Sequence, residues 1–276
     1  MQTFIKLVTI TYTMGKFEDV CNKIKSLEIQ GAENIAKAGL VAYSLKPGKD
    51  SIKRLLSLRP TEPCLANALR YAEKYSTESA FHYLEEADEI IAKIGAKLVR
   101  GTVYTHCHSS SVNKVFSESK KKFKVNCTET RPMFQGRITA KELADLSINV
   151  TLYIDSAMRL AIKKANVAMI GADSITVDGE VINKIGSELA ADTCGHFKVP
   201  LYIITNSWKL DLRSLYNQEV PIEERPTSEV WDKKPKGVKI MNPAFEKIKA
   251  SSIKAIISEL GILSPKEFVK RALGNF

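Results

Sequence analysis

Residues 97–111 read KLVRGTVYTHCHSSS, an apolar run that stops at a cluster of polar residues. Four later runs repeat this pattern: FKVNC (123–127) stops at TETRP, INVTLYI (148–154) at DS, VAMI (167–170) at GADS, and LYII (201–204) at TNS. Short apolar runs that alternate with helical stretches are typical of parallel strands joined by crossover helices. The sequence therefore predicts an α/β fold with an open parallel sheet.

The unusual polar residues of this half fall where the predicted strands end. In an open parallel sheet, ligands bind beyond the carboxyl ends of the strands. Helices that begin at this edge point their free amides toward it, which favours an anionic group. We expect one serine of residues 109–111 to cap one such helix. Thr139 and Glu142 should form a capping box, and Asp155 or Ser156 should cap a third helix.

Composition excludes several classes of protein. No run of about 18 apolar residues is present, so we expect no transmembrane helix. The five cysteines are scattered and never form C-x-x-C, which favours a reduced cytoplasmic environment over a disulfide scaffold or a metal site. The net charge of +10 is spread along the chain without interleaved aromatic residues. Nucleic-acid binding should therefore be weak, salt-sensitive and non-specific.

The front third of the chain has a helical pattern. We expect helices at 17–35, interrupted by Gln30-Gly31-Ala32, at 50–58 with Asp50 or Ser51 as its cap, at 64–74 and at 79–95. This pattern predicts an N-terminal helical domain, 1–95, in which residues 1–13 are an extension. A Rossmann-like parallel-sheet domain should follow at 96–276. Within it, Asp178-Gly179 predicts a tight hairpin, and residues 216–236 predict a long surface loop.

Several motifs in order resemble one family. They are Thr105-His106-Cys107-His108-Ser109, Thr128-Glu129-Thr130-Arg131-Pro132 with Gln135-Gly136, Gly171-Ala172-Asp173-Ser174-Ile175, Asn183-Lys184-Ile185-Gly186, Gln30-Gly31-Ala32, Arg59-Pro60-Thr61 and Asn242-Pro243-Ala244-Phe245. The chain resembles the alpha, beta and delta subunits of translation initiation factor 2B. That family also contains methylthioribose-1-phosphate isomerase and archaeal ribose-1,5-bisphosphate isomerase. The resemblance implies a helical domain, a Rossmann-like domain and a homodimer formed through the latter.

The isomerase branches of the family imply roles for particular residues. Cys107 and Asp173 would be the catalytic pair of an aldose-ketose isomerase, an intramolecular oxidoreductase that needs no cofactor or metal. A phosphate on C1 locks the sugar ring, so an acid must protonate the ring oxygen and a second group must help to move hydrogen between C1 and C2. A protonated carboxylic acid and a thiolate would suit these tasks. Substrate and phosphate contacts would come from Gln30, Gly31, Ala32, Arg59, Gln135, Asn183 and Lys184.

Without the resemblance, simpler interpretations compete for several of these residues. Cys107 could be a small buried side chain, because free cysteines are usually core residues. Asp173 could be a turn cap. His106 should make structural hydrogen bonds, whereas the sequence leaves the role of His108 open. Arg131 lies either on the surface or at the mouth of the crevice.

Two functions remain open at this point. The isomerases carry Arg where this chain has Gln30, so a charge-assisted phosphate contact worth about 1.5–3 kcal/mol is missing. That change favours a regulatory subunit of the initiation-factor type, which binds the alpha subunit of translation initiation factor 2 and a phosphorylated sugar or nucleotide. Cys107 together with Asp173 favours an isomerase of the ribose-1,5-bisphosphate type with an altered substrate. We expect the regulatory subunit, with the isomerase as the alternative.

Overall fold

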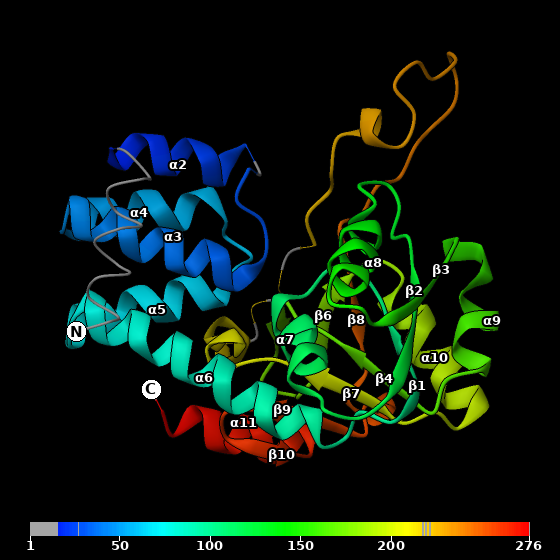
Figure 1. Ribbon diagram of the computed structural model, residues 1–276. Coiled ribbons are helices and arrows are strands. Elements are labelled where there is room, and N and C mark those ends of the chain that lie inside the picture. The colour runs from blue at the N-terminus through cyan, green and yellow to red at the C-terminus, as the bar shows by residue number, and fades with distance from the viewer. Residues whose placement is uncertain (1–15, 27, 217, 219, 221, 276) are drawn as a thin grey trace.

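The computed structural model describes residues 16–26, 28–216, 218, 220 and 222–275 (Figure 1). The extension expected at residues 1–13 lies outside them. Five helices come first: α2 (Phe17–Lys25), α3 (Ala32–Leu45), α4 (Lys49–Leu58), α5 (Pro63–Lys74) and α6 (Thr77–Ala96). The helix α3 runs further than expected because Leu40, Val41 and Ala42 continue its buried face. Gly48, not Asp50 or Ser51, occupies the N-cap position of α4.

A seven-stranded sheet forms the centre of the second part. Its strands are β1 (Gly101–Thr105), β2 (Phe123–Thr128), β3 (Asn149–Tyr153), β4 (Val167–Ile170), β7 (Leu201–Ile204), β9 (Ala255–Ser258) and β10 (Gly261–Leu263). The strand order is β10-β9-β7-β4-β1-β2-β3, and all pairs are parallel except β10 with β9. The predicted α/β fold is therefore confirmed, and each of the five predicted apolar runs contains a strand.

Helices cover both faces of this sheet (Figure 1). They are α7 (Ser110–Glu118), α8 (Gln135–Asp145), α9 (Met158–Lys163), α10 (Ser187–Phe197) and α11 (Pro265–Leu273). The short 3-10 helices are η1 (Asp155–Ala157), η2 (Ser207–Lys209), η3 (Leu212–Tyr216), η4 (Thr227–Glu229) and η5 (Ala250–Ser252). Side chains of a strand alternate between its two faces. In β4, Val167 and Met169 pack toward α6, α7 and α8, whereas Ala168 and Ile170 pack toward α9, α10 and α11.

A small antiparallel sheet lies beside the large one. It consists of β5 (Ser174–Ile175), β6 (Val181–Lys184) and β8 (Phe245–Ile248) in the order β5-β6-β8. The predicted hairpin at Asp178-Gly179 joins β5 to β6, and the Gly179 amide donates to the Thr176 carbonyl at 2.9 Å. Ile175 and Val181 are fully buried in the core, so they are unavailable to a subunit interface.

Polar and aromatic contacts fix the helical part against the sheet. The Asn67 amide of α5 donates to the carbonyls of Trp208, at 2.8 Å, and Leu210, at 3.0 Å. The Tyr83 hydroxyl of α6 donates to Glu259 at 2.7 Å, and its ring stacks on Trp208 with 4.3 Å between the ring centroids. Both contacts lie next to the end of β7. They therefore hold the helical part over the carboxyl edge of the sheet.

Two more of the expected helix caps are wrong. Thr139 lies inside α8, not at its start, and its hydroxyl donates to the Cys107 carbonyl at 2.9 Å. Asp155 accepts hydrogen bonds from the backbone amides of Thr130 and Arg131, so it holds the loop after β2 instead of capping α9. The expected cap on α7 is correct, since the Ser109 side chain accepts from the Val112 amide.

Close packing at Gly136 positions α8, and this predicts an effect on stability. A Cβ atom at this position would lie 1.7 Å from the Thr128 carbonyl oxygen of β2. Gly136→Ala should therefore lower the free energy of unfolding by about 1–3 kcal/mol or more, as measured by denaturant unfolding. Gly195→Ala in α10 is the control, since its Cβ would meet no atom within 4 Å. The control should gain about 0.5–1 kcal/mol, and equal effects of the two substitutions would contradict this packing.

Candidate functional site

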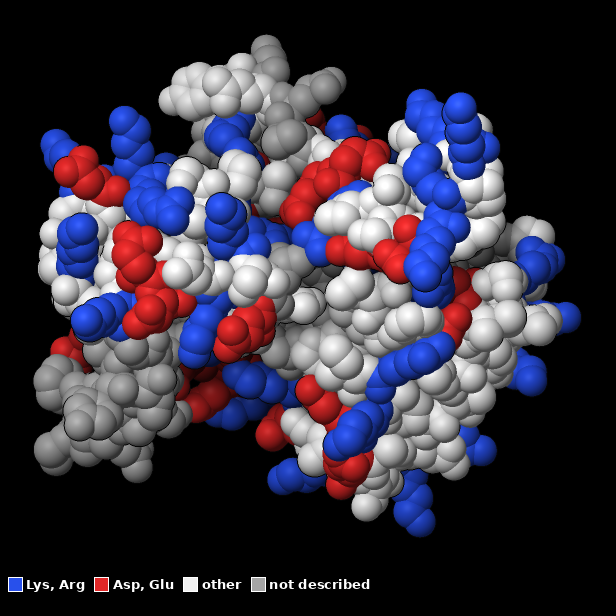
Figure 2. Space-filling view, turned by 90° about the horizontal axis from the view of Figure 1, so that it is seen from above, with Lys and Arg blue, Asp and Glu red and all other residues white. Residues whose placement is uncertain are grey.

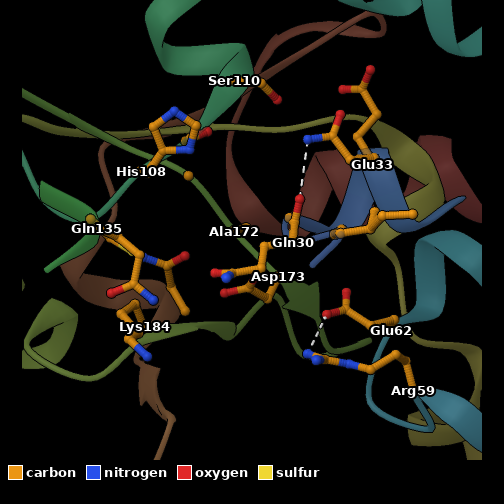
Figure 3. Close-up of a pocket in the computed structure, with 18 of the residues that line it drawn as sticks. Gln30, Glu33, Arg59, Glu62, His108, Ser110, Gln135, Ala172, Asp173 and Lys184 are labelled. Carbon is orange, nitrogen blue, oxygen red and sulfur yellow. Dashed lines mark hydrogen bonds and ion pairs between the residues drawn. The ribbon is translucent and has the colours of Figure 1, made fainter. Parts of the chain in front are cut away.

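A pocket of about 650 Å³ lies between the helical part and the carboxyl edge of the sheet (Figure 3). All nine residues that the sequence singled out line it. They are Gln30, Gly31, Ala32, Arg59, Cys107, Gln135, Asp173, Asn183 and Lys184. The space-filling view shows acidic and basic side chains interleaved around the hollow between the two parts (Figure 2). The exposed face in this view is thus not a uniformly basic surface of the kind that binds nucleic acid.

Cys107 directly follows β1 and has an unusual backbone conformation, with φ of 65°. Its amide donates to the Thr130 hydroxyl at 3.0 Å, and Thr139 donates to its carbonyl, so both backbone groups are held in place. Strained backbone of this kind often occurs at functional sites. Burial raises the pKa of the Cys107 thiol to about 12, although the charge of Lys184 lowers it. Burial in this pocket therefore favours the thiol form of Cys107 over the thiolate.

Asp173 follows β4, the strand that pairs with β1, and reaches the same pocket. Burial raises the pKa of its carboxyl group, although the charges of Lys209 and Lys184 lower it. With its amide group turned to donate, the Asn183 nitrogen lies 3.3 Å from Asp173 Oδ2. A carboxyl group with a raised pKa is a stronger base than an ordinary carboxylate, which suits proton transfer near neutral pH.

Two buried lysines lie near Asp173. Lys184 ends β6 and packs over the Phe245 ring, with 6.0 Å from Nζ to the ring centroid. No carboxylate of the described residues lies within 4.0 Å of its Nζ. Lys209 ends η2, and its Nζ donates to the Ala172 carbonyl at 2.6 Å. Lys209 was not predicted as a site residue from the sequence, although it lies only five residues beyond the end of β7.

Arg59 is paired with two carboxylates in the pocket. Its Nη2 atom lies 3.1 Å from Glu62 Oε1 and 3.5 Å from Glu223 Oε2. Burial, together with the nearby charge of Asp173, raises the pKa of Glu62 to about 7. The sequence analysis did not single out Glu62, Glu223 or Arg225, which also lines the pocket. No local pattern could have found Glu223 and Arg225, because they lie in the long loop after η3.

The first turn of α3 forms another wall of the pocket. Gly31 is the N-cap residue with φ of 86°, a conformation that favours glycine, and no side chain caps this helix end. The free amides that follow Gly31 are therefore available to an anion. Gln30 lies exposed at the mouth, where its carbonyl accepts from the Asn34 side chain at 3.1 Å.

Gln135 is the first residue of α8 and contributes its side chain to the opposite wall. Its Oε1 atom is buried and has no hydrogen-bond partner. Since buried polar atoms are normally paired, this oxygen is a free acceptor for a ligand that donates a hydrogen bond.

A second group of charged side chains connects the pocket wall to the sheet helices. Lys37 contacts Glu33 and lies 3.6 Å from Asp88, and Lys114 of α7 contacts Asp88 as well. Burial raises the pKa of Glu33 to about 7, and hydrogen bonding to Asp88 adds to this shift. When Glu33 is protonated, it can donate a hydrogen bond to Asp88, which two ionised carboxylates could not share. This network ties α3, α6 and α7 together and neutralises Lys37.

The two neighbours of Cys107 have structural contacts. Both ring nitrogens of His106 are engaged, with the Thr128 hydroxyl at 2.7 Å and the Ile185 carbonyl at 2.8 Å. Burial lowers the pKa of His106, so it stays neutral. His108 lies at the pocket and contacts Glu142 at 3.0 Å. Arg131 is exposed and donates to the Val230 carbonyl, which places it on the surface.

Within the described ranges, no group of three or more His, Cys, Asp or Glu side chains could hold a metal ion. None of the helices that the structure describes is both long and apolar enough to cross a membrane.

The chain is similar to known proteins over most of its length. A protein of Methanocaldococcus jannaschii named ribose 1,5-bisphosphate isomerase is 36% identical, and the alignment covers 92% of this chain and 93% of that protein. A Pyrococcus furiosus protein named putative translation initiation factor eIF-2B subunit 2-like is 32% identical, with 91% and 97% covered.

The fold agrees with these relatives. The crystal structure of translation initiation factor eIF-2B from Pyrococcus horikoshii superimposes with a TM-score of 0.79 at 26% identity, covering 92% of this chain and 98% of that one. The model of the initiation factor 2 subunit family matches residues 30–265, which include every one of the nine pocket residues predicted from the sequence. The chain belongs to the initiation factor 2 subunit family.

Proposed function

We propose that this protein is an aldose-ketose isomerase acting on a C1-phosphorylated sugar. The observation that carries the proposal is that Cys107 and Asp173, from the ends of two paired strands, line one pocket with the buried Lys184. The relative at 36% identity that is named ribose 1,5-bisphosphate isomerase supports it. The alternative function from the sequence is thus better supported than the regulatory subunit that we ranked first.

The protonation states suggest how the reaction proceeds. The Cys107 thiol, with a pKa of about 12, donates its proton to the ring oxygen as the bond from that oxygen to C1 breaks. A hydride, the hydrogen with its electron pair, then moves from C2 to C1. Asp173 accepts the proton of the C2 hydroxyl as C2 becomes a carbonyl carbon. Proton return from Asp173 to the thiolate restores the starting state. We propose these roles in place of those implied by the family resemblance, because burial favours the protonated thiol.

The pocket supplies an anchor for the phosphate. Lys184 offers a positive charge, and the uncapped amides that follow Gly31 offer hydrogen-bond donors. Both face the same cavity as Cys107 and Asp173. A phosphate held there would keep C1 beside the two groups that move protons.

A regulatory subunit of the initiation-factor type is the second candidate. The relative at 32% identity named as an eIF-2B subunit 2-like protein favours it, as does the exposed Gln30 where isomerases carry Arg. Such a subunit would bind the alpha subunit of translation initiation factor 2. The five free cysteines fit a cytoplasmic location for either function.

Substitution of the two reacting groups tests the proposed activity. Cys107→Ser and Asp173→Asn should each lower turnover of a C1-phosphorylated ribose by about 10²–10⁴-fold, because each removes one proton-transferring group. Binding measured by calorimetry should change little. Cys194→Ser is the control, since that thiol is buried outside the pocket. The proposal fails if the unaltered protein turns over no C1-phosphorylated sugar, and retention of the initiation-factor alpha subunit in a pull-down would then favour the second candidate.

We also propose a homodimer formed through the sheet part. Apolar side chains are exposed on and near β3, an edge strand of the sheet. They are Leu152, Ile154, Leu160 and Leu189, and Ile154 is 59% exposed. Exposed apolar side chains in one region often mark a protein interface.

Light scattering tests the dimer directly. The protein should have twice the 30.7 kDa mass of one chain at micromolar concentration. Ile154→Lys should shift it toward the monomer, because a charge would be buried in the interface. Ile90→Lys on α6 makes the same change at an exposed site away from β3 and should leave the mass unchanged. A monomer in the unaltered protein would refute this interface.

A further inference from the structure

The positive side chains of the pocket differ in how far they are already neutralised. Among the residues that the structure describes, Lys37 contacts Glu33, and Arg225 contacts Glu223 at 3.2 Å as well as Glu229. Carboxylates therefore already neutralise most of the charge of Lys37 and Arg225. A phosphate that used them would have to displace carboxylates that are already in place.

Arg59 is also neutralised by carboxylates, although the family resemblance implies that it binds phosphate. Glu62 and Glu223 both lie within 3.5 Å of its Nη2 atom. The Arg59 side chain is only 11% exposed, so its pairs are poorly screened by water. Lys184 has neither a carboxylate within 4.0 Å nor a carbonyl partner among the described residues. Lys209 also lines the pocket without a carboxylate partner among the described residues, but its Nζ already donates to the Ala172 carbonyl. Lys184 is therefore the cation best placed to hold a phosphate, and the paired Arg59 is not free to form a second phosphate site.

Glu62 gives the Arg59 end of the pocket an unpaired hydrogen-bond acceptor. The residue is 4% exposed, and its Oε2 atom is buried without a hydrogen-bond partner. In the view of Figure 3, Asp173 lies between Lys184 on one side and the Glu62–Arg59 pair on the other. An unpartnered buried carboxylate oxygen accepts a hydrogen bond from a hydroxyl group, whereas it repels a phosphate.

Building on the proposed function, we propose that Glu62 determines substrate specificity: it neutralises Arg59 and accepts a hydrogen bond from a sugar hydroxyl. The preferred substrate is then a sugar monophosphate with its phosphate at Lys184 and a free hydroxyl at the far end. A second phosphate at that end would face the Glu62 carboxylate. Binding of a bisphosphate is disfavoured for this reason.

Calorimetric titration with two ligands tests the proposal. Ribose 1-phosphate has a free hydroxyl at C5, and ribose 1,5-bisphosphate has a phosphate there. The unaltered protein should bind the monophosphate at least as tightly as the bisphosphate. In Glu62→Gln, the ratio of the two affinities should shift toward the bisphosphate by about tenfold or more, because the carboxylate charge is lost and Arg59 keeps only one of its two carboxylate partners.

Two further variants make the result specific. Glu28→Gln removes an equal charge from an exposed residue of the same pocket that does not contact Arg59, and it should leave the ratio unchanged. Glu223→Gln removes the second partner of Arg59 and should shift the ratio in the same direction as Glu62→Gln, but less. Glu223→Gln also tests the proposal if Glu62→Gln does not fold. The Glu62 side chain caps no amide of α5, so we expect Glu62→Gln to leave this helix intact.

The proposal is wrong if the unaltered protein binds the bisphosphate about tenfold more tightly, or if neither Glu62→Gln nor Glu223→Gln alters the ratio of the two affinities. A ratio that shifts equally in Glu28→Gln would also overturn it, since the effect would then be one of general charge. These affinities do not depend on turnover. Failure of the isomerase assay and failure of the specificity proposal are therefore separate results.

Discussion

The parallel pairing of β1 with β4 is the constraint on which the site depends. The register aligns Val103 with Val167 and Tyr104 with Ala168, so the two strands end at the same edge of the sheet. The chain beyond one strand places Cys107 at this edge, and the chain beyond the other places Asp173 there. Both flanking faces are packed with apolar side chains, so the strands cannot slide without exposing the core. The distance between the two reacting groups is thus fixed by the sheet itself.

The helical part completes the pocket and sets its charge. It contributes the uncapped start of α3, the Arg59–Glu62 pair and the Glu33–Lys37 contact, while the long loop adds Glu223 and Arg225. Carboxylates thus accompany most of the cations in the pocket. This arrangement limits the number of phosphates that can bind. Burial, aided by neighbouring carboxyl groups, raises the pKa values of Glu33 and Glu62. The same balance disfavours non-specific binding of polyanions.

Features encoded locally could be predicted from the sequence. The strand ends gave the positions of Cys107 and Asp173, and the Asp178-Gly179 hairpin brings Lys184 into the pocket. Features that depend on long-range packing could not be predicted. The ionisation state of Cys107 depends on burial, and the pairing of Arg59 needs a loop more than 150 residues away. The predicted caps at Thr139 and Asp155 were wrong because these side chains instead form hydrogen bonds with Cys107 and Thr130, which are distant in the sequence.

A crystal structure of the Cys107→Ser variant with a bound C1-phosphorylated sugar tests the central claim most directly. We predict that the phosphate contacts Lys184 and the amides after Gly31, and that C1 and C2 lie beside position 107 and Asp173. The far hydroxyl should lie within hydrogen-bond distance of Glu62, with Arg59 still paired. A phosphate that displaces Glu62 from Arg59, or a sugar bound away from the carboxyl edge of the sheet, would contradict the account.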